Sequence, residues 1–135
     1  MILIDTNIFL ELALGQEKAK ECKEFLNAVS EGKFEVTITH FTIHAMAAIL
    51  GRGPRLTEFL RSLENAEGVS VYDTSVSEEV SAALMADRIK RDFDDTLQYF
   101  VAKKIGSEAI VSFDKHFDNL DIPRLSPDAL LKKLN

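Results

Sequence analysis

The chain has little of what disulfide-bonded, membrane or secreted proteins need. It contains a single cysteine, Cys22, which cannot form an internal disulfide and suits a reducing cytoplasm. No apolar run approaches the ~20 residues of a membrane span. The first residues lack the basic region of a signal peptide, and Asp5 and Glu11 interrupt their apolar run. We therefore expect a cytoplasmic protein with no membrane contact.

Positive charge is also scarce. Sixteen Lys and Arg residues face 22 Asp and Glu residues, for a formal net charge of -6. This balance argues against a broad basic surface for duplex nucleic acid, although it leaves room for a basic rim around an acidic pocket. The 46% hydrophobic and 28% charged residues are typical of an ordinary globular protein, and the length predicts one domain over residues 1–135.

Strand and helix patterns alternate along the chain, which is typical of a parallel sheet covered by helices. Strands are expected at residues 2–4, 34–39, 69–72 and 109–112, with a short edge strand at 122–125, where Pro123 argues against a central place. Helices are expected at residues 6–13, 17–30, 41–50, 55–63, from a Ser75 or Ser77 cap to about 91, from 94–95 to about 106, and at 127–134. The expected class is α/β, with a central parallel sheet of four to five strands flanked by helices.

Three acidic residues stand out by their positions. Asp5 ends the first expected strand, Asp114 follows the fourth, and Asp95 starts the helix that leads into the fourth. Ligands of open α/β sheets bind at the carboxyl ends of strands, so the three side chains converge if the two strands are neighbours. Their oxygens suit Mg²⁺ or Mn²⁺, and such ions can stabilise both the attacking and the leaving oxygen of a phosphodiester.

The same acids have a simpler interpretation as helix caps. Aspartate is among the best N-cap residues, and Asp5, Asp94 and Asp95 all lie near expected helix starts. For any one of them alone, capping is the favoured interpretation. Only their convergence at one edge of the sheet favours a metal site.

Two segments and the residues between them resemble the PIN domain family. The segments are residues 3–9 (LIDTNIF) and 110–117 (IVSFDKHF), and between them lie Asp95, an apolar helix and Gly106. PIN domains are Mg²⁺- or Mn²⁺-dependent nucleases, and many small prokaryotic members are VapC-type ribonuclease toxins paired with an antitoxin. The resemblance spans nearly the whole chain and implies a three-layer PIN-like fold.

The resemblance implies a role for each matching residue. Asp5, Asp95 and Asp114 match the metal-binding catalytic acids, and Asn7 and Ser112 match polar positions that support them. The implied activity is metal-dependent hydrolysis of RNA to products with a 5′-phosphate and a 3′-hydroxyl. A homodimer and an antitoxin partner are further implied expectations.

The chain departs from the family at one acid. The helix after the second strand usually carries a Glu, but here Ala45 takes that place, next to His44. His44 is either a ligand better suited to Mn²⁺ than to Mg²⁺, or a helix residue with a hydrogen-bonded ring. Asp94 or Glu11 could supply the missing charge. His116 stands where the family often has a further acid, and it either contacts phosphate or lies exposed.

The missing acid favours an alternative function, a catalytically weakened PIN-like domain that binds RNA or a protein. An aspartate-based phosphotransfer or receiver-like domain is a second alternative. Arg88 and Arg91 precede the Asp95 helix and are the expected phosphate contacts, although such charges more often form a solvated helix face. Excess apolar surface on the helices at 41–50 and 55–63 indicates a subunit interface or a partner groove.

Overall fold

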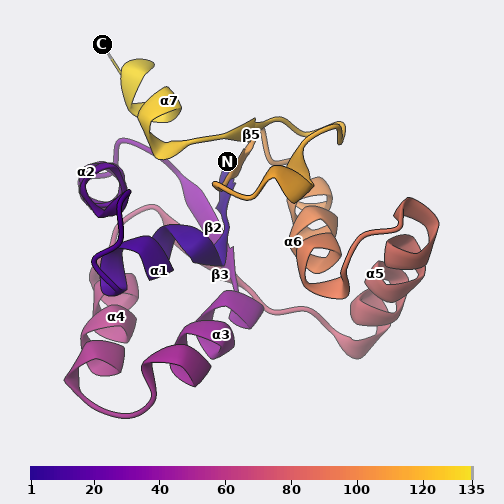
Figure 1. Cartoon of the computed structure of the whole chain (residues 1–135), viewed down its shortest axis with the longest axis horizontal. Helices are drawn as coiled ribbons and strands as arrows, with labels where there is room; N and C mark the ends of the chain where they lie inside the picture. Colours follow the sequence, from indigo (N-terminus) through magenta and orange to yellow (C-terminus); the bar gives the residue numbers. More distant parts are fainter. Residues whose placement is uncertain (135) are drawn as a thin grey trace.

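A computed structural model, which describes residues 1–134, shows a five-stranded parallel sheet between two layers of helices (Figure 1). The strand order is β3-β2-β1-β4-β5, so the first strand of the chain lies in the middle. This confirms the expected α/β class and the central parallel sheet. The strands are β1 (Ile2–Ile4), β2 (Val36–Thr39), β3 (Val69–Tyr72), β4 (Ile110–Val111) and β5 (Arg124–Leu125).

Alternating side chains of the strands build two cores on opposite faces of the sheet. Ile2 and Ile4 pack into one core, whereas Leu3 packs into the other. On β4, Val111 joins the first core and Ile110 the second. Because these strands are buried on both faces, their sequences are continuous apolar runs, as is usual for strands within a parallel sheet.

The helices divide unequally between the two faces (Figure 1). One layer contains α1 (Thr6–Ala13), α2 (Ala19–Ser30), α3 (His40–Leu50), α4 (Pro54–Asn65) and α7 (Pro127–Lys132). The other contains α5 (Val76–Ile89), α6 (Phe93–Lys104) and the short 3₁₀ helix η1 (Lys115–Phe117). Among residues 1–134, none of the helices combines the length and the apolarity of a membrane span.

Two strands turn directly into helices whose first residues are capped by the end of the strand. Asp5 Oδ1 accepts a hydrogen bond from the Thr6 backbone N–H at 2.9 Å, at the start of α1. Thr39 Oγ1 accepts one from the Thr42 backbone N–H at 3.1 Å, at the start of α3. Polar side chains are therefore fixed at the carboxyl ends of β1 and β2, where the chain leaves the sheet.

The predicted boundaries of strands and helices differ from the observed ones by a few residues. Two of these differences, at the start of α2 and the end of α5, have a local cause. The helix predicted from residue 17 begins at Ala19, because the preceding residues form a turn in which the Glu11 side chain accepts from the Lys18 backbone at 2.9 Å. The helix predicted to reach 91 ends at Ile89, because Lys90 has a left-handed conformation with φ 56°. The expected short edge strand is present as β5, which begins just after Pro123.

Candidate metal centre

Asp5 lies at the carboxyl end of β1 and is almost completely buried, with 8% of its surface exposed. Besides the Thr6 backbone, its carboxylate accepts hydrogen bonds from Ser112 Oγ at 2.8 Å and from Gln98 Nε2 at 3.3 Å. All three donors are neutral groups. Burial is the main cause that raises the pKa of Asp5; the hydrogen bonds act in the opposite direction, and the charge of Asp114 adds to the rise.

Ser112 connects the end of β1 to the segment after β4. Its hydroxyl donates to Asp5 and accepts from Asn7 Nδ2 at 3.1 Å and from the Asp114 backbone N–H at 2.9 Å. Asn7 Oδ1 in turn accepts from the Phe113 backbone N–H at 3.4 Å. The structure thus brings the two predicted supporting residues, Asn7 and Ser112, together with Asp5 and Asp114.

Asp95, Asp114 and His116 converge beside this network. His116 Nδ1 lies 3.2 Å from Asp95 Oδ2 and 3.2 Å from Asp114 Oδ1, and one ligand atom from each of the three residues lies within 4.8 Å of the others. Burial raises the pKa of Asp95, the charges of Asp114 and Asp5 raise it further, and His116 opposes the rise. The acids from β1, α6 and the end of β4 therefore share one electrostatic site.

This donor set fits a divalent cation. Carboxylate oxygens are the preferred ligands of Mg²⁺ and Mn²⁺, and an imidazole nitrogen is accepted by Mn²⁺ and the later transition ions. Burial, and after it the charge of neighbouring acids, raises the pKa values of Asp5 and Asp95, so their ionised forms are unfavourable. A bound cation would offset this cost, so these residues could hold a metal.

Arg91 fixes the loop that carries His116. Its Nε donates to the His116 carbonyl at 3.1 Å, and its Nη2 donates to the Asp118 carbonyl at 3.4 Å. Arg124 binds the Asp118 carboxylate through two bonds of 2.8 and 3.2 Å. The guanidinium expected to contact phosphate is therefore bound to the protein backbone, whereas Arg88, in the last turn of α5, is exposed.

Three other candidates lie outside the converging group. Within the part of the chain that the structure describes, the cluster able to hold a metal comprises Asp95, Asp114 and His116. His44 is exposed on α3, with its ring centroid 5.9 Å from that of His40. Asp94 is exposed in the first turn of α6, and Glu11 binds the Lys18 backbone. That His44 or Asp94 supports the site stays a prediction.

Gln98 takes part in the site although it was not predicted from the sequence. It is 1% exposed, its Oε1 accepts from Thr39 Oγ1 at 2.8 Å, and its Nε2 donates to Thr42 Oγ1 at 2.9 Å as well as to Asp5. The sequence does contain one sign of this role: Gln98 is an amide three residues after Asp95, among the apolar residues of the same helix. That spacing places both side chains on one side of α6.

Ala45 occupies the place of the expected Glu. It follows Thr42 by three residues, so it lies on the side of α3 that faces Gln98 and Thr6, and it is half-buried. On this side of α3 the chain therefore has the methyl group of Ala45 and the hydroxyl of Thr42. Helix α3 contributes no carboxylate to this network.

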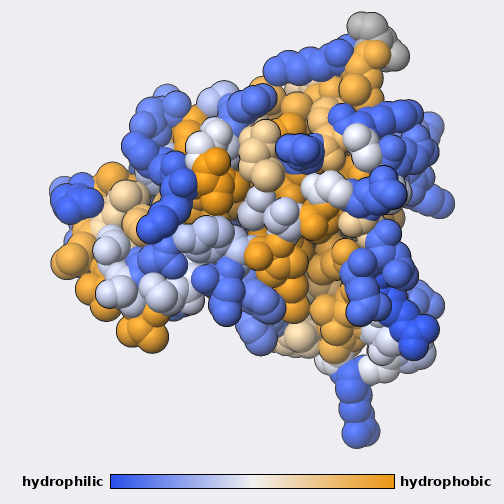
Figure 2. Space-filling view, turned by 180° about the vertical axis from the view of Figure 1, so that it is seen from behind, coloured by the Kyte–Doolittle hydropathy of each residue, from blue (hydrophilic) through white to orange (hydrophobic). Residues whose placement is uncertain are grey.

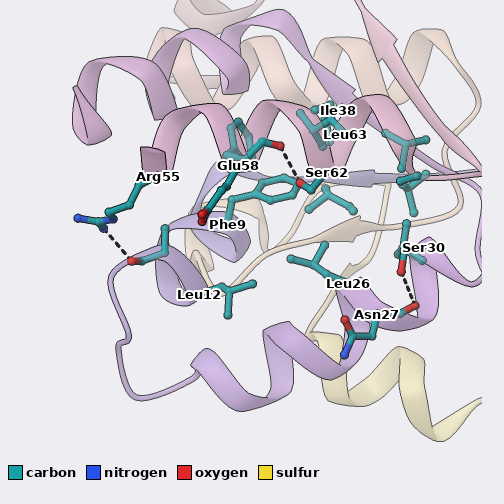
Figure 3. Close-up of a pocket in the computed structure, with 17 residues that line it drawn as sticks. Phe9, Leu12, Leu26, Asn27, Ser30, Ile38, Arg55, Glu58, Ser62 and Leu63 are labelled. Atoms are coloured by element: carbon teal, nitrogen blue, oxygen red, sulfur yellow. Dashed lines mark hydrogen bonds between the residues drawn. The ribbon is translucent and has the colours of Figure 1, made fainter. Parts of the chain in front are cut away.

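An apolar groove of about 400 Å³ lies away from the acids, between α2 and α4 (Figure 3). Phe9, Leu26, Phe59 and Leu63 contribute to its lining. Side chains of α4 line the groove, and none of the α4 side chains is fully buried. The groove accounts for the excess apolar surface expected on the helix at 55–63.

Exposed apolar side chains also gather on α5, at the left edge of Figure 2. Val76, Val80 and Leu84 are 81%, 55% and 57% exposed, and they are spaced four residues apart. That spacing places them on one stripe of the helix. The stripe faces away from α6, which covers the other side of α5.

Comparison with protein families and solved structures places this geometry in context. A family model described as the PIN domain matches residues 2–123. A search of curated proteins gives no significant match. Among solved structures, VapC20 from Mycobacterium tuberculosis, described as a sarcin–ricin loop cleaving toxin, has a TM-score of 0.76 at 20% identity, over 94% of this chain and 100% of that one.

Two further structures share the fold. A toxin–antitoxin complex from Klebsiella pneumoniae has a TM-score of 0.73 at 16% identity, covering 94% of this chain and 98% of that one. FitAcB from Neisseria gonorrhoeae has a TM-score of 0.60 at 18% identity, with the same coverage of 94% and 98%. At these identities, the likeness is one of fold.

Proposed function

The chain belongs to the PIN domain family, and from this premise we propose that it is a divalent-metal-dependent endoribonuclease with Asp5, Asp95 and Asp114 as its metal-binding catalytic acids. The observation that carries the proposal is that Asp95 and Asp114 form one cluster beside the buried hydrogen-bond network of Asp5, at the carboxyl edge of the sheet. The raised pKa values of Asp5 and Asp95 support it, because such a set gains free energy from a cation.

Each residue near the acids has a proposed part in this reaction. A bound Mg²⁺ or Mn²⁺ would supply charge neutralisation at the phosphodiester and activation of water. Ser112 and Gln98 hold the Asp5 carboxylate in a fixed orientation, and Asn7 holds Ser112. Arg88 is the proposed phosphate contact, because its side chain is exposed.

A cleavage assay with a matched pair of variants tests the proposal. RNA of mixed sequence is incubated with the protein and Mg²⁺ or Mn²⁺, and the product ends are mapped. Asp95→Asn should reduce cleavage by at least about 100-fold, whereas Asp87→Asn, which changes an exposed acid on α5, should cleave normally. Cleavage that survives both Asp95→Asn and Asp5→Asn would overturn the site assignment.

Ala45 favours a second candidate function, binding of RNA or protein without cleavage. The site lacks the acid that the family usually places on this helix, so it offers one negative charge fewer for a cation. RNA binding that persists while every divalent ion fails to support cleavage would favour this candidate.

We also propose an antitoxin as partner, with the groove between α2 and α4 as its docking site. The apolar lining by Phe9, Phe59 and Leu63 suits an apolar segment of a partner chain. The fold likeness to a toxin–antitoxin complex supports this choice. If an adjacent gene encodes a small protein, co-purification of the two should be lost with Phe59→Asp and kept with the exposed-face control Arg61→Asp.

The apolar stripe on α5 is the proposed contact between two copies of the chain. A second copy would cover Val76, Val80 and Leu84, whose exposure is otherwise unfavourable. The mass in solution, measured by light scattering, should be that of a dimer for the wild type and of a monomer for Val80→Glu. A monomeric wild type would contradict this assignment.

A further inference from the structure

We propose that His116 is a ligand of the metal centre, alongside Asp95 and Asp114, and that it makes this centre prefer Mn²⁺ or a later transition ion to Mg²⁺. The inference rests on the proposed metal-dependent function, and it concerns which atoms bind the ion and which ion they select.

The spacing of the three side chains supports direct ligation. Nδ1 of His116 lies 3.2 Å from a carboxylate oxygen of Asp95 and 3.2 Å from one of Asp114. Two ligands that are each ~2.1 Å from one ion, in adjacent octahedral positions, are about 3 Å apart. The nitrogen therefore already lies at close to the separation from each oxygen that a shared ion requires, and the two oxygens lie within 4.8 Å of each other.

The backbone of His116 is held in place by bonds on both sides. Its N–H donates to Asp114 Oδ1 at 2.9 Å, and its carbonyl accepts from Arg91 Nε at 3.1 Å. The next part of the loop is fixed by the bonds from Arg91 and Arg124 to Asp118. A ligand on a fixed backbone loses less conformational freedom when it binds, which favours binding.

The chemistry of the site supports a preference for Mn²⁺ over Mg²⁺. Helix α3 offers a methyl group at Ala45 in place of a carboxylate, and the loop offers an imidazole. Mg²⁺ selects oxygen ligands and gains most from negative charge, whereas imidazole suits Mn²⁺ and the ions that follow it in the first transition row. Exchanging an acid for a histidine therefore weakens Mg²⁺ binding more than Mn²⁺ binding.

The alternative role of His116 is that of a hydrogen-bond partner that occupies the Asp95 and Asp114 carboxylates. The two roles predict opposite effects of removing the ring. A ligand strengthens metal binding, so its loss weakens binding, whereas a partner that occupies the carboxylates competes with the metal, so its loss strengthens binding. The variant His116→Ala thus decides between them.

Calorimetric titration of the EDTA-treated full-length protein with MnCl₂ and with MgCl₂ provides the measurement. His116→Ala should weaken Mn²⁺ binding by at least about tenfold and Mg²⁺ binding by less. His116→Asp should restore affinity and shift the preference toward Mg²⁺. His40→Ala removes a histidine outside the cluster and should change neither affinity.

Electron spin-echo spectroscopy of the Mn²⁺-loaded protein gives an independent readout. The wild type and His40→Ala should show modulation from a directly bound ¹⁴N nucleus, and His116→Ala should lose it. Mn²⁺ binding that His116→Ala leaves unchanged or strengthens, while Asp95→Asn abolishes it, would overturn the ligand role of His116 and keep the metal-dependent function. A wild type that binds neither ion would overturn both.

Discussion

The Ser112 hydroxyl lies 2.8 Å from Oδ2 of Asp5, although the two residues are 107 positions apart in the sequence. Their strands are neighbours, and the register that pairs Ile4 with Val111 brings the next residue of each strand to the same level of the sheet. The geometry of the site is thus set by the pairing of β1 with β4. Changes in the sheet and changes in the site should be thermodynamically coupled.

Replacing Ser112 with alanine should destabilise the metal-free protein by about 1–3 kcal/mol. The change removes a donor from the buried Asp5 carboxylate and an acceptor from Asn7 and from the Asp114 backbone. Urea unfolding followed by circular dichroism measures the loss. Ser112→Thr keeps the hydroxyl and should cost less, so equal stability of the wild type and Ser112→Ala would contradict the proposed role.

Replacing Gln98 with leucine should cost about 2–3 kcal/mol of unfolding free energy. The amide is buried, and its loss leaves Thr39 Oγ1 without its acceptor and Asp5 with one donor fewer. The matched control is Gln16→Leu at an exposed position, where the change should stay within about 0.5 kcal/mol. Similar midpoints for the two variants in urea would show that the Gln98 network contributes little.

The strands and the three acids could be predicted because each depends on local sequence. A buried strand followed at once by a helix is visible in residues 2–10, and parallel strands place their ends at one edge. Asp95 and Asp114 lie in one cluster, and Ser112 connects Asp114 to Asp5; that the three acids bind one metal stays a prediction. The boundary errors lie at the ends of strands and helices; a side-chain bond to the Lys18 backbone precedes α2, and left-handed Lys90 ends α5.

The contacts of Gln98, Arg91 and His116 could not be predicted in the same way. Each depends on a partner far along the chain: Gln98 is 93 residues from Asp5, and Arg91 is 25 residues from His116. The sequence does not distinguish a buried amide from an exposed one. The role of Gln98 becomes visible only when the Thr39 and Thr42 hydroxyls are placed beside it. The sequence does not reveal that Arg91 donates to the His116 and Asp118 carbonyls; that it contacts phosphate stays a prediction.

Replacing Ala45 with glutamate should restore the missing acid. The side chain lies on the side of α3 that faces the buried network, so the carboxylate should strengthen Mg²⁺ binding by at least about tenfold. The same charge should lower the stability of the metal-free protein, because it adds to the repulsion with Asp5 and Asp95. Titration calorimetry and thermal unfolding in EDTA measure the two effects.

The control for that variant is Ala48→Glu, which adds the same charge at an exposed position of the same helix. It should leave Mg²⁺ affinity and metal-free stability close to those of the wild type. If both variants behave alike, Ala45 does not face the metal centre, and the departure from the family has no electrostatic consequence there.

Replacing Asp95 with asparagine should raise the stability of the metal-free protein while it abolishes metal binding. The pKa of Asp95 in the folded protein lies above its ordinary value of 3.8, first through burial and then through the charges of Asp114 and Asp5. Above pH 3.8 the folded state therefore binds more protons than the unfolded state, so stability falls as the pH rises through the raised pKa. The neutral amide removes this cost, and the melting temperature at pH 7 in EDTA should rise by about 3 °C.

The pH dependence separates this electrostatic effect from a packing effect. The gain from Asp95→Asn should be largest at neutral pH and should shrink toward pH 3.8, where the aspartic acid is itself protonated and resembles the amide. Asp87→Asn, at an exposed position of α5, is the matched control for the loss of one carboxylate charge. Adding Mn²⁺ should reverse the order, because the ion stabilises only the protein that binds it. A gain that is constant from pH 4 to pH 7 would mean that the repulsion between the acids does not limit stability, and that the site gains no free energy from charge neutralisation when a metal binds.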